Sequence, residues 1–494
     1  DPWKGDDATH FGVAYSMLDG GHWLIPRLAG EPWLDSPPLF HWIAAVLAKV
    51  IGLVLPLHDA AHLATGLFAG IMIACLWAAA RRFIGQEAAR GAVLVALGCL
   101  GLLVHAHEFQ PAIVHLAATA ALYWGLALLP EQPRRGGALA GAALGLGFLA
   151  VGLPVLITLG PLLLLLPLIW SRLRTSQGAH GMLAALAVAA PLILIWPLTL
   201  YLKDPAAFAA WWTRELAGLK PGSNVPLSLW NFLQLLSWFA WPALPLAAWT
   251  LWKERRRLIE PRTLIPLTSF VVLLAVQSVF SEPRSLNALP LLPPLILLAA
   301  PATLSLRRGA ANAFDWFGMM TFSLLAGLIW LGWAAMVFGV PPQIAKNMVR
   351  QVPGFVAHFM PIAFAVSLAL TFAWLWLIFA SPRSPQRGTM HWAAGVTLCW
   401  GLLMALWLPW VNYDRSYRHV AASLKAALPA ERGCIAGRGL GSTQRAAFHY
   451  FAGIQTARDG SRAAAQCRLY LVQGTAQKEA PPSGSGWRKI WEGS

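Results

Sequence analysis

The chain has 494 residues, of which 57% are hydrophobic and only 12% are charged, and its formal net charge is +16. Soluble domains carry about a quarter of charged residues, so this composition excludes an ordinary soluble protein and places the chain in a membrane. The basic residues lie between apolar runs, which argues against nucleic acid as the partner of the positive charge.

Apolar runs of about 18 to 25 residues recur along the chain, and each is long enough to cross a hydrocarbon core of about 30 Å as a helix. The runs are continuous and rich in Leu and Ala, whereas the strands of a membrane barrel would alternate. We therefore predict an all-α polytopic membrane domain over residues 59–411. The predicted spans cover residues 60–82, 89–106, 111–130, 137–153, 154–170, 181–201, 228–252, 263–281, 286–305, 314–338, 356–380 and 391–411.

The segment before these spans, residues 1–58, is predicted to be an extracytoplasmic loop. It begins abruptly in polar sequence, so we expect a further membrane helix to precede Asp1. Residues 37–57 are apolar enough to cross, but a span there would invert the side assigned to every later loop. We therefore predict that this stretch is an amphipathic helix lying in the membrane interface.

Short basic clusters follow alternate spans, and the positive-inside rule assigns them to the cytoplasm. They include Arg81-Arg82, Arg134-Arg135, Lys253 to Arg257, Arg307-Arg308 and Arg383 with Arg387. The opposite side then receives residues 1–58, 105–110, 202–227, 281–287 and 341–355, and the tail from residue 412. All long polar segments are thus predicted to be extracytoplasmic.

The tail, residues 412–494, is predicted to be a small α/β domain. A helix is expected at about 416–428, and short strands are expected near Cys434 and over 468–472. Cys434 and Cys467 would form a disulfide in an oxidising compartment, and the alternative is two buried thiols.

Acidic residues are scarce, yet six of the 21 lie in the first 35 positions. Charge at the edge of an apolar bundle indicates a functional site, and the alternative is a solvated loop. Asp6 and Asp7 precede a predicted helix, whose dipole favours their ionised form, so either could act as a catalytic base. The cluster consists of Asp1, Asp6, Asp7, Asp19, Glu31 and Asp35, of which Asp19 and Glu31 are better explained as solvated.

Glu108 lies in a predicted turn on the same side as these acids and is a third candidate catalytic residue. His105 and His107 flank it, but their spacing matches no strong zinc motif. Polar caps of the membrane helices explain these histidines better. We assign no metal ligand and no cofactor from the sequence, although a divalent metal stays open.

Cations on the same side are candidates for binding a phosphate. Arg284 lies in the tight turn Ser281 to Ser285, where its guanidinium could bind a phosphate bidentately or pair with Glu282. Lys203 and Arg214 are further candidates. Residues 203–226 are expected to hold a short interfacial helix with Arg214, Glu215 and Lys220 on its wet side.

Three segments of the first loop carry a family resemblance. They read Asp6-Asp7, then Met17-Leu18-Asp19-Gly20-Gly21-His22-Trp23-Leu24-Ile25-Pro26, then Ser36-Pro37-Pro38-Leu39-Phe40-His41-Trp42. They resemble the first extracytoplasmic loop of GT-C glycosyltransferases in the superfamily of aminoarabinose transferases and protein O-mannosyltransferases. Residues 281–294, with Leu289-Pro290 and Pro293-Pro294, also look like a later turn of that family.

The resemblance implies a GT-C fold with an additional first helix and a C-terminal extracytoplasmic domain. It implies a multi-pass protein of the bacterial inner membrane, with its site facing the periplasm, that takes sugar from a polyprenyl-phosphate carrier. Asp6 or Asp7 would deprotonate the acceptor, and Arg284, Lys203 or Arg214 would bind the donor phosphate. The candidate substrate-binding residues are His10, Asp35, His41, Trp42 and Gln110.

Two positions depart from the family pattern. Ser36 stands where the family has a lysine, and Thr9 stands where an arginine sometimes occurs. The acceptor, a lipid A-like glycolipid, a glycan or a protein, therefore stays open. A carrier flippase or transporter and a catalytically inactive scaffold are the alternative functions; membrane lipids are expected partners in each case, and nucleic acid is not.

Overall fold

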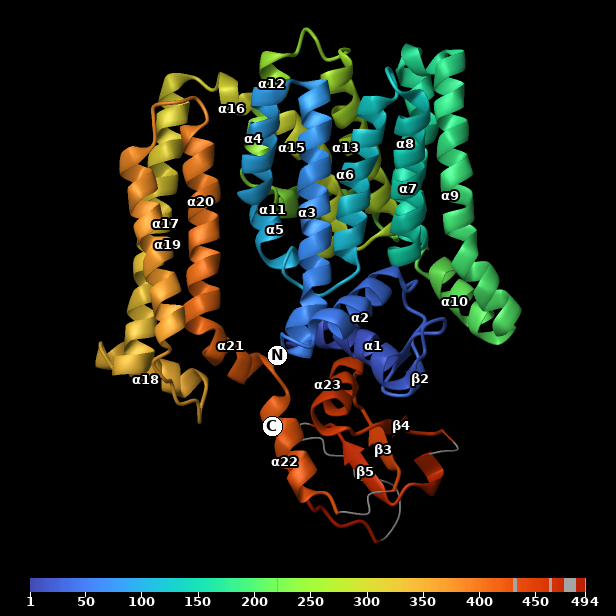
Figure 1. Ribbon diagram of the computed structural model, residues 1–494, viewed down its shortest axis with the longest axis vertical. Helices are drawn as coiled ribbons and strands as arrows, with labels where there is room; N and C mark the ends of the chain where they lie inside the picture. Colours follow the sequence, from blue (N-terminus) through green and yellow to red (C-terminus); the bar gives the residue numbers. More distant parts are fainter. Residues whose placement is uncertain (220, 430–432, 462–463, 475–485, 494) are drawn as a thin grey trace.

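The computed structural model describes residues 1–219, 221–429, 433–461, 464–474 and 486–493. Figure 1 shows a broad bundle of long helices with the first and last parts of the chain together beneath one end. The helices of the bundle are α3 (Leu57–Phe83), α4 (Gln86–Leu97), α5 (Leu100–His105), α6 (Ala112–Leu128), α7 (Pro133–Val151), α8 (Leu153–Ile169), α9 (Ser176–Lys203), α11 (Val225–Phe239), α12 (Ala243–Lys253), α13 (Pro261–Phe280), α15 (Leu292–Ala299), α17 (Arg308–Phe338), α19 (Pro361–Ala380) and α20 (Arg387–Leu402).

Within the described residues, seven helical segments are long and apolar enough to cross a membrane. They coincide with seven of the twelve predicted spans, and the chain is a multi-pass membrane protein, as predicted. Four other predicted spans are helical but shorter, interrupted or less apolar. These are α4 with α5, then α6, α7 and α8.

The remaining predicted span, residues 228–252, is not one continuous helix as predicted. It consists of α11 and α12, which meet at an angle of 102°. The break falls at Trp241-Pro242, where the proline has no N–H for a helical hydrogen bond. The carbonyl of Trp241 instead accepts a hydrogen bond of 3.0 Å from the backbone N–H of Leu100, which ties the bend to α5.

Small residues let α7 and α9 pack with their backbones almost in contact. A Cβ atom at Gly137 would lie 1.9 Å from the carbonyl oxygen of Gly181, and one at Gly141 would lie 2.2 Å from that of Ala185. In lipid, where apolar surface alone gives no drive to associate, such close packing stabilises helix pairs. α6 lies against α7 and α3, and nearly all of its side chains are buried.

The loop before the bundle folds as α1 (Asp6–Gly20), a two-stranded ribbon of β1 (Arg27–Leu28) and β2 (Glu31–Pro32), and α2 (Leu39–Ile51). Figure 1 shows α1 and α2 across the lower end of the bundle, beneath α3 and α6. The 13 residues of α2 rise by about 20 Å, which is too short to cross the membrane. α2 buries Phe40 and Ala44 against the fold and exposes Val46 and Val50, as an interfacial helix would.

The C-terminal segment is a small α/β unit, as predicted. It comprises α21 (Leu408–Arg415), α22 (Arg418–Ala427), α23 (Ser442–Ala452) and a parallel sheet in the order β4-β3-β5. The strands are β3 (Ile435–Arg438), β4 (Thr456–Arg458) and β5 (Leu469–Val472). Cys434 and Cys467 form a disulfide, which settles the choice between a bond and two thiols.

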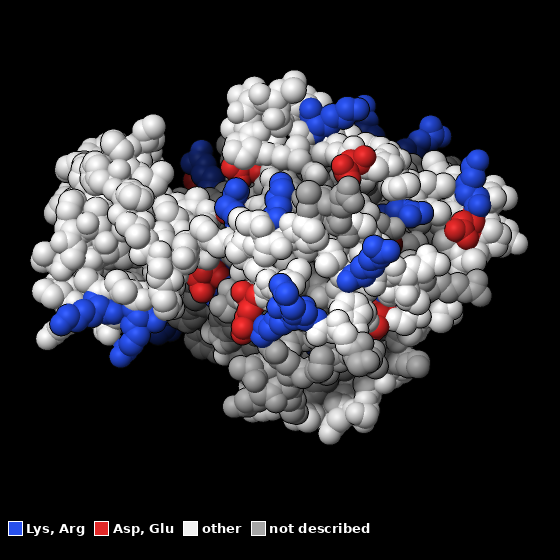
Figure 2. Space-filling model, turned by 90° about the horizontal axis from the view of Figure 1, so that it is seen from below, with Lys and Arg blue, Asp and Glu red and all other residues white. Residues whose placement is uncertain are grey.

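The polar elements gather at one end of the bundle. Figure 1 shows α1, α2, α10 (Pro205–Ala217), α18 (Pro342–Gln351) and the C-terminal unit at the lower end, and α12 and α16 (Ala302–Ser305) at the upper end. Seen from below, the lower face carries scattered basic side chains with acidic ones between them (Figure 2). This arrangement matches the sidedness predicted from the basic clusters.

Candidate active site

The carboxylate pair begins α1. Gly5, at φ 113°, precedes the helix in a backbone conformation that side chains disfavour, and Asp6 and Asp7 occupy the first turn. The side chain of Asp6 is exposed and has no hydrogen-bond or ion-pair partner among the described residues. The helix dipole favours its ionised form, so Asp6 presents a free carboxylate to its surroundings.

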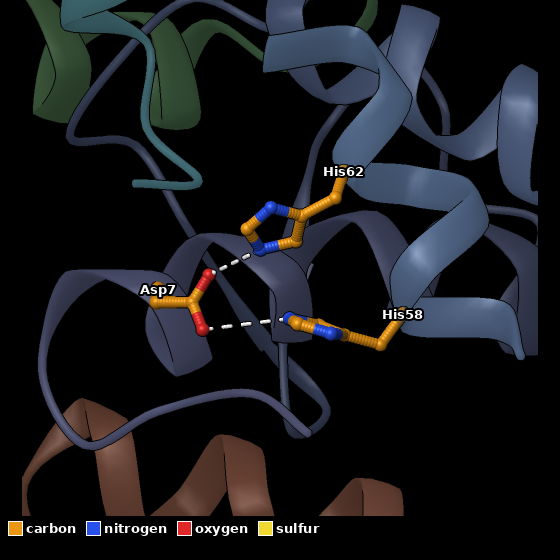
Figure 3. A group of neighbouring side chains, drawn as sticks. All are labelled: Asp7, His58 and His62. Atoms are coloured by element: carbon orange, nitrogen blue, oxygen red, sulfur yellow. Dashed lines mark hydrogen bonds and ion pairs between the residues drawn. The ribbon is translucent and has the colours of Figure 1, made fainter. Parts of the chain in front are cut away.

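Asp7 points the other way and is buried between two histidines of α3 (Figure 3). One carboxylate oxygen lies 2.8 Å from Nε2 of His62 and the other lies 3.4 Å from Nε2 of His58. The backbone N–H of Trp3 also donates to this carboxylate, over 2.6 Å. Burial alone would raise the pKa of Asp7, but the hydrogen bonds and charges of the two histidines outweigh it and lower the pKa.

His10, one turn further along α1, is the centre of a second cluster. Its Nδ1 lies 3.1 Å from Nε2 of His41 on α2, and its ring meets that of Trp33 edge to face. Burial lowers the pKa of His10 to about 4, although the nearby charges of Asp6, Asp35 and Asp7 act in the opposite direction. Two predicted substrate-binding residues, His10 and His41, are therefore in contact.

The turn between α5 and α6 holds Glu108 beside this region. Its carboxylate is hydrogen-bonded to Nδ1 of His105 at 2.6 Å and accepts from the amide of Gln110 at 2.8 Å. The backbone carbonyl of Glu108 accepts from Thr65 of α3. The next residue, Phe109, packs its ring 5.3 Å from that of His62, which joins this turn to the Asp7 cluster.

The three predicted phosphate-binding cations differ in their surroundings. Arg214 on α10 forms an ion pair with Asp35, whose charge also acts on His10, so Arg214 lies at the edge of the acidic cluster. Arg284 pairs with Glu282 in its own turn at 2.5 Å, with both side chains largely exposed. Lys203 is exposed at the end of α9.

Two further predictions concern Trp42 and the helix that carries Arg214. Trp42 donates from Nε1 to the carbonyl of Trp23, and this bond fixes α2 to the loop. The helix at 205–217 exists, but the prediction that Glu215 lies on its wet side is wrong. Glu215 accepts hydrogen bonds from Trp211 Nε1 and from the backbone N–H of Leu153, and burial raises its pKa. Lys220 lies outside the residues that the structure describes.

The C-terminal unit covers the outer face of α1 through α23. A Cβ atom at Gly12 would lie 2.5 Å from that of Ala446, so the two helices are in close contact. Thr9 is hydrogen-bonded to Thr443 at 3.1 Å. Asp19 and Glu31, which the sequence suggested were merely solvated, pair with His449 and Arg445 of α23.

The structure therefore brings together Asp6, Asp7, His10 and His41. The turn with Glu108 and Gln110 is next to this group, because Phe109 of that turn packs against His62. Sequence reasoning missed His58 and His62. Their signal was the spacing of four residues at the start of an apolar helix, which puts both side chains on one helical face.

The contact of His10 with His41 predicts a pH dependence of stability. Burial lowers the pKa of His41 well below its usual value and that of His10 to about 4. Below about pH 6.5 these histidines are therefore protonated in the unfolded chain but stay neutral in the folded chain. The free energy of unfolding consequently falls as the pH falls, by at most about 1.4 kcal/mol per pH unit for each histidine.

Thermal unfolding of the purified protein at pH 7.5 and pH 5 measures this effect. His41→Gln should lose less melting temperature between the two pH values than the wild type. His180→Gln, which removes an exposed histidine, should behave as the wild type does. Equal losses in all three proteins would contradict the prediction.

Known proteins resemble this chain in sequence and in fold. Residues 35–196 match the family model described as dolichyl-phosphate-mannose-protein mannosyltransferase. The chain is 27% identical over 312 residues to undecaprenyl phosphate-alpha-4-amino-4-deoxy-L-arabinose arabinosyl transferase 1 of Sodalis glossinidius, covering 60% of this chain and 54% of that protein. It is 26% identical over 420 residues to undecaprenyl phosphate-alpha-4-amino-4-deoxy-L-arabinose arabinosyl transferase 2 of Pseudomonas fluorescens, covering 82% of this chain and 67% of that protein. The match thus spans about half the length of the first relative.

The fold is similar to two solved structures of ArnT from Cupriavidus metallidurans, one in the apo state and one bound to undecaprenyl phosphate. Each aligns with a TM-score of 0.68 at 18% identity. The alignments cover 94% and 95% of this chain and 82% and 85% of the solved ones. In sequence and in fold, the chain is similar to GT-C glycosyltransferases of the superfamily of aminoarabinose transferases and protein O-mannosyltransferases.

Proposed function

We propose that the protein is an inverting glycosyltransferase that moves a sugar from a polyprenyl-phosphate carrier to an extracytoplasmic acceptor. The observation that carries the proposal is the division of the acid pair. Asp7 is buried between two histidines, whereas Asp6 is exposed and unpaired among the described residues. Only Asp6 is therefore free to receive a proton from an acceptor.

In the proposed reaction, the Asp6 carboxylate takes the proton of an acceptor hydroxyl while the hydroxyl oxygen attacks the anomeric carbon of the sugar. The bond from that carbon to the phosphate oxygen breaks, and its electron pair stays on the phosphate. One displacement inverts the configuration at the anomeric carbon. Proton transfer by a positioned carboxylate accelerates such a step by about 10²–10⁴-fold.

Arg214 is the cation best placed to bind the donor phosphate. It is half exposed, and its partner Asp35 belongs to the acidic cluster around His10. A fixed guanidinium stabilises the charge that develops on a leaving phosphate. Ser36 stands where the family has a lysine, and it is buried and offers no cation. The charge that the family lysine would supply must therefore come from another residue, and this supports the assignment of Arg214.

The carrier would approach from the lipid. Leu198 and Leu202 of α9 are exposed, as is Leu216 of α10, the helix that carries Arg214. A polyprenyl chain would lie on such apolar surface. A polyprenyl phosphate as the donor is supported by the ArnT structure that is bound to undecaprenyl phosphate.

We place the protein in the bacterial inner membrane with this site facing the periplasm. The acidic elements and the disulfide lie at the end of the bundle opposite the basic clusters, which supports that orientation. The acceptor is a component of the envelope, either a glycolipid similar to lipid A, a glycan or a protein.

Mass spectrometry of a deletion strain tests this function. Carrier-linked sugar should accumulate, and one envelope glycolipid, glycan or protein should lose a sugar of the same mass. The wild-type gene should restore both signals. An unchanged carrier pool together with unchanged envelope components would contradict transfer, whereas sugar accumulating only on the cytoplasmic leaflet would indicate a flippase.

A further inference from the structure

We propose that Asp7, His58 and His62 form a binding site for a divalent metal ion of the zinc type. The site lies where the first turn of α1 meets the first turns of α3 (Figure 3). One ligand atom from each residue can be chosen so that all three lie within 4.8 Å of one another.

The local sequence explains why the three side chains converge. α3 begins at Leu57, directly after Pro56, so His58 and His62 are four residues apart in its first two turns. Residues at that spacing share one face of a helix. The face points at α1, where Asp7 extends its carboxylate between the two rings.

The distances need little change to accept an ion. Zinc binds imidazole nitrogen and carboxylate oxygen at about 2.0–2.2 Å, so ligands in tetrahedral geometry stand about 3.3 Å from one another. The carboxylate oxygens of Asp7 lie 3.4 Å from Nε2 of His58 and 2.8 Å from Nε2 of His62. The two imidazole rings lie 4.4 Å apart, centroid to centroid.

An unsatisfied histidine is the second, independent observation. The side chain of His58 is only 8% exposed, yet neither of its ring nitrogens has a well-aligned hydrogen bond: Nε2 lies 3.4 Å from the carboxylate of Asp7 and Nδ1 lies 3.5 Å from that of Asp59. A buried polar atom that lacks a well-made hydrogen bond costs the fold free energy. Coordination of a metal by Nε2 of His58 would remove that cost. A cluster of the same three side chains without a metal would not remove it.

The ligand set selects the type of metal. Two imidazoles and one carboxylate suit zinc and its neighbours among the transition metals, whereas magnesium and calcium prefer sites made of oxygen alone. Three protein ligands leave a fourth position for water. Oδ1 of Asp59 lies 3.5 Å from Nδ1 of His58, the ring nitrogen that would not bind the metal. A carboxylate at that nitrogen commonly orients the ring of a metal-binding histidine.

Apolar rings enclose the cluster. Phe11 meets His58 edge to face at 4.9 Å, and Phe109 lies 5.3 Å from His62. Restricted access of water strengthens the attraction between the ion and its carboxylate. The ion would thereby fix the start of α1 to α3 and hold the neighbouring Asp6 in place; this last consequence rests on the proposed function, but the metal site does not.

Metal content and binding test the proposal without an assay of transfer. The full chain is purified with an affinity tag that contains no histidine, stripped with a chelator and titrated with ZnCl₂ alone while bound metal is measured by mass spectrometry. We expect about one tightly held zinc ion per chain. Cobalt should give the visible absorption of a tetrahedral site, which reports the geometry in the unmutated protein.

Variants assign the ligands. His58→Gln, His62→Gln and Asp7→Asn should each lose more affinity than the roughly 10–100-fold that Asp59→Asn should cost from behind the ligand. His180→Gln removes an exposed histidine of α9 and should bind zinc as the wild type does. Absence of tight zinc binding by the wild type would overturn the proposal, as would full binding by Asp7→Asn or His58→Gln.

Binding and transfer fail separately. Zinc bound at this site by a protein that transfers no sugar would refute the proposed function and leave the metal site standing. Transfer by a wild-type protein that holds no metal would do the opposite. Circular dichroism and size-exclusion chromatography of each variant show whether the protein is folded.

Discussion

Asp6→Asn should give a folded protein that transfers sugar about 10²–10⁴-fold more slowly than the wild type, because its amide cannot take the proton of the acceptor. The side chain of Asp6 is exposed and has no partner among the described residues, so its replacement should change stability little. The measurement is the rate of transfer from extracted carrier-linked sugar by protein in nanodiscs. Zinc binding and melting temperature are measured on the same sample.

Asp414→Asn is the matched control, because Asp414 is also an exposed acid, on α21 at the lower end of the molecule, and among the described residues it pairs only with its neighbour Arg415. It should transfer at the wild-type rate. Asp7→Asn should differ from Asp6→Asn by losing metal as well as activity. Full activity of Asp6→Asn together with loss in Asp7→Asn alone would move the base to Asp7 and contradict the assignment.

Arg214→Gln should lower kcat/KM for the carrier-linked donor by about 10²–10³-fold, since removal of one group that stabilises charge in a transition state costs about that much. Arg214 is linked through Asp35 to the cluster around His10, whereas Arg284 is occupied by Glu282 in an exposed turn. The loss should therefore be larger for Arg214→Gln than for Arg284→Gln or Lys203→Gln. Arg214→Lys should keep part of the activity, because it retains the charge but not the fork of donors.

Arg350→Gln is the control for the loss of a surface cation. Arg350 lies on α18 at the same end of the bundle and contacts only Asn347 through its guanidinium among the described residues. It should leave kcat/KM unchanged. If Arg284→Gln is the most damaging of the three substitutions, the phosphate binds at the turn after α13 and not beside α10.

Much of the fold could be predicted, because membrane helices satisfy their backbone hydrogen bonds internally and so follow local composition. The bend at Pro242 could not be predicted in this way. α9 continues through Pro191 and Pro197, and α13 continues through Pro266, so a proline alone does not decide whether a span breaks. The contact of Trp241 with Leu100 on another helix accompanies the bend, and no local pattern shows it.

The site shows the same division between local and tertiary information. The pairing of acids at the start of a helix is local, and the prediction of α1 at Asp6 followed from it. His58 and His62 become part of the site only because α1 folds back onto α3, since Asp7 and His58 are 51 positions apart along the chain. Glu215 was predicted on the wrong face of α10 because its hydrogen-bond donors, Nε1 of Trp211 and the backbone N–H of Leu153, lie on the inner face. The pattern of apolar and polar residues along the helix does not reveal such donors.

The contact of α23 with α1 joins residues that are made far apart in time during synthesis. Thr9 and Thr443 are 434 positions apart, yet their hydroxyls are hydrogen-bonded, and a Cβ atom at Gly12 would lie 2.5 Å from that of Ala446. During synthesis this face of α1 therefore stays uncovered until α23 has been made and has reached the same side of the membrane. Assembly of the acidic site is consequently coupled to the synthesis of α23, and a product that stops before α23 would leave this face of α1 exposed to proteases.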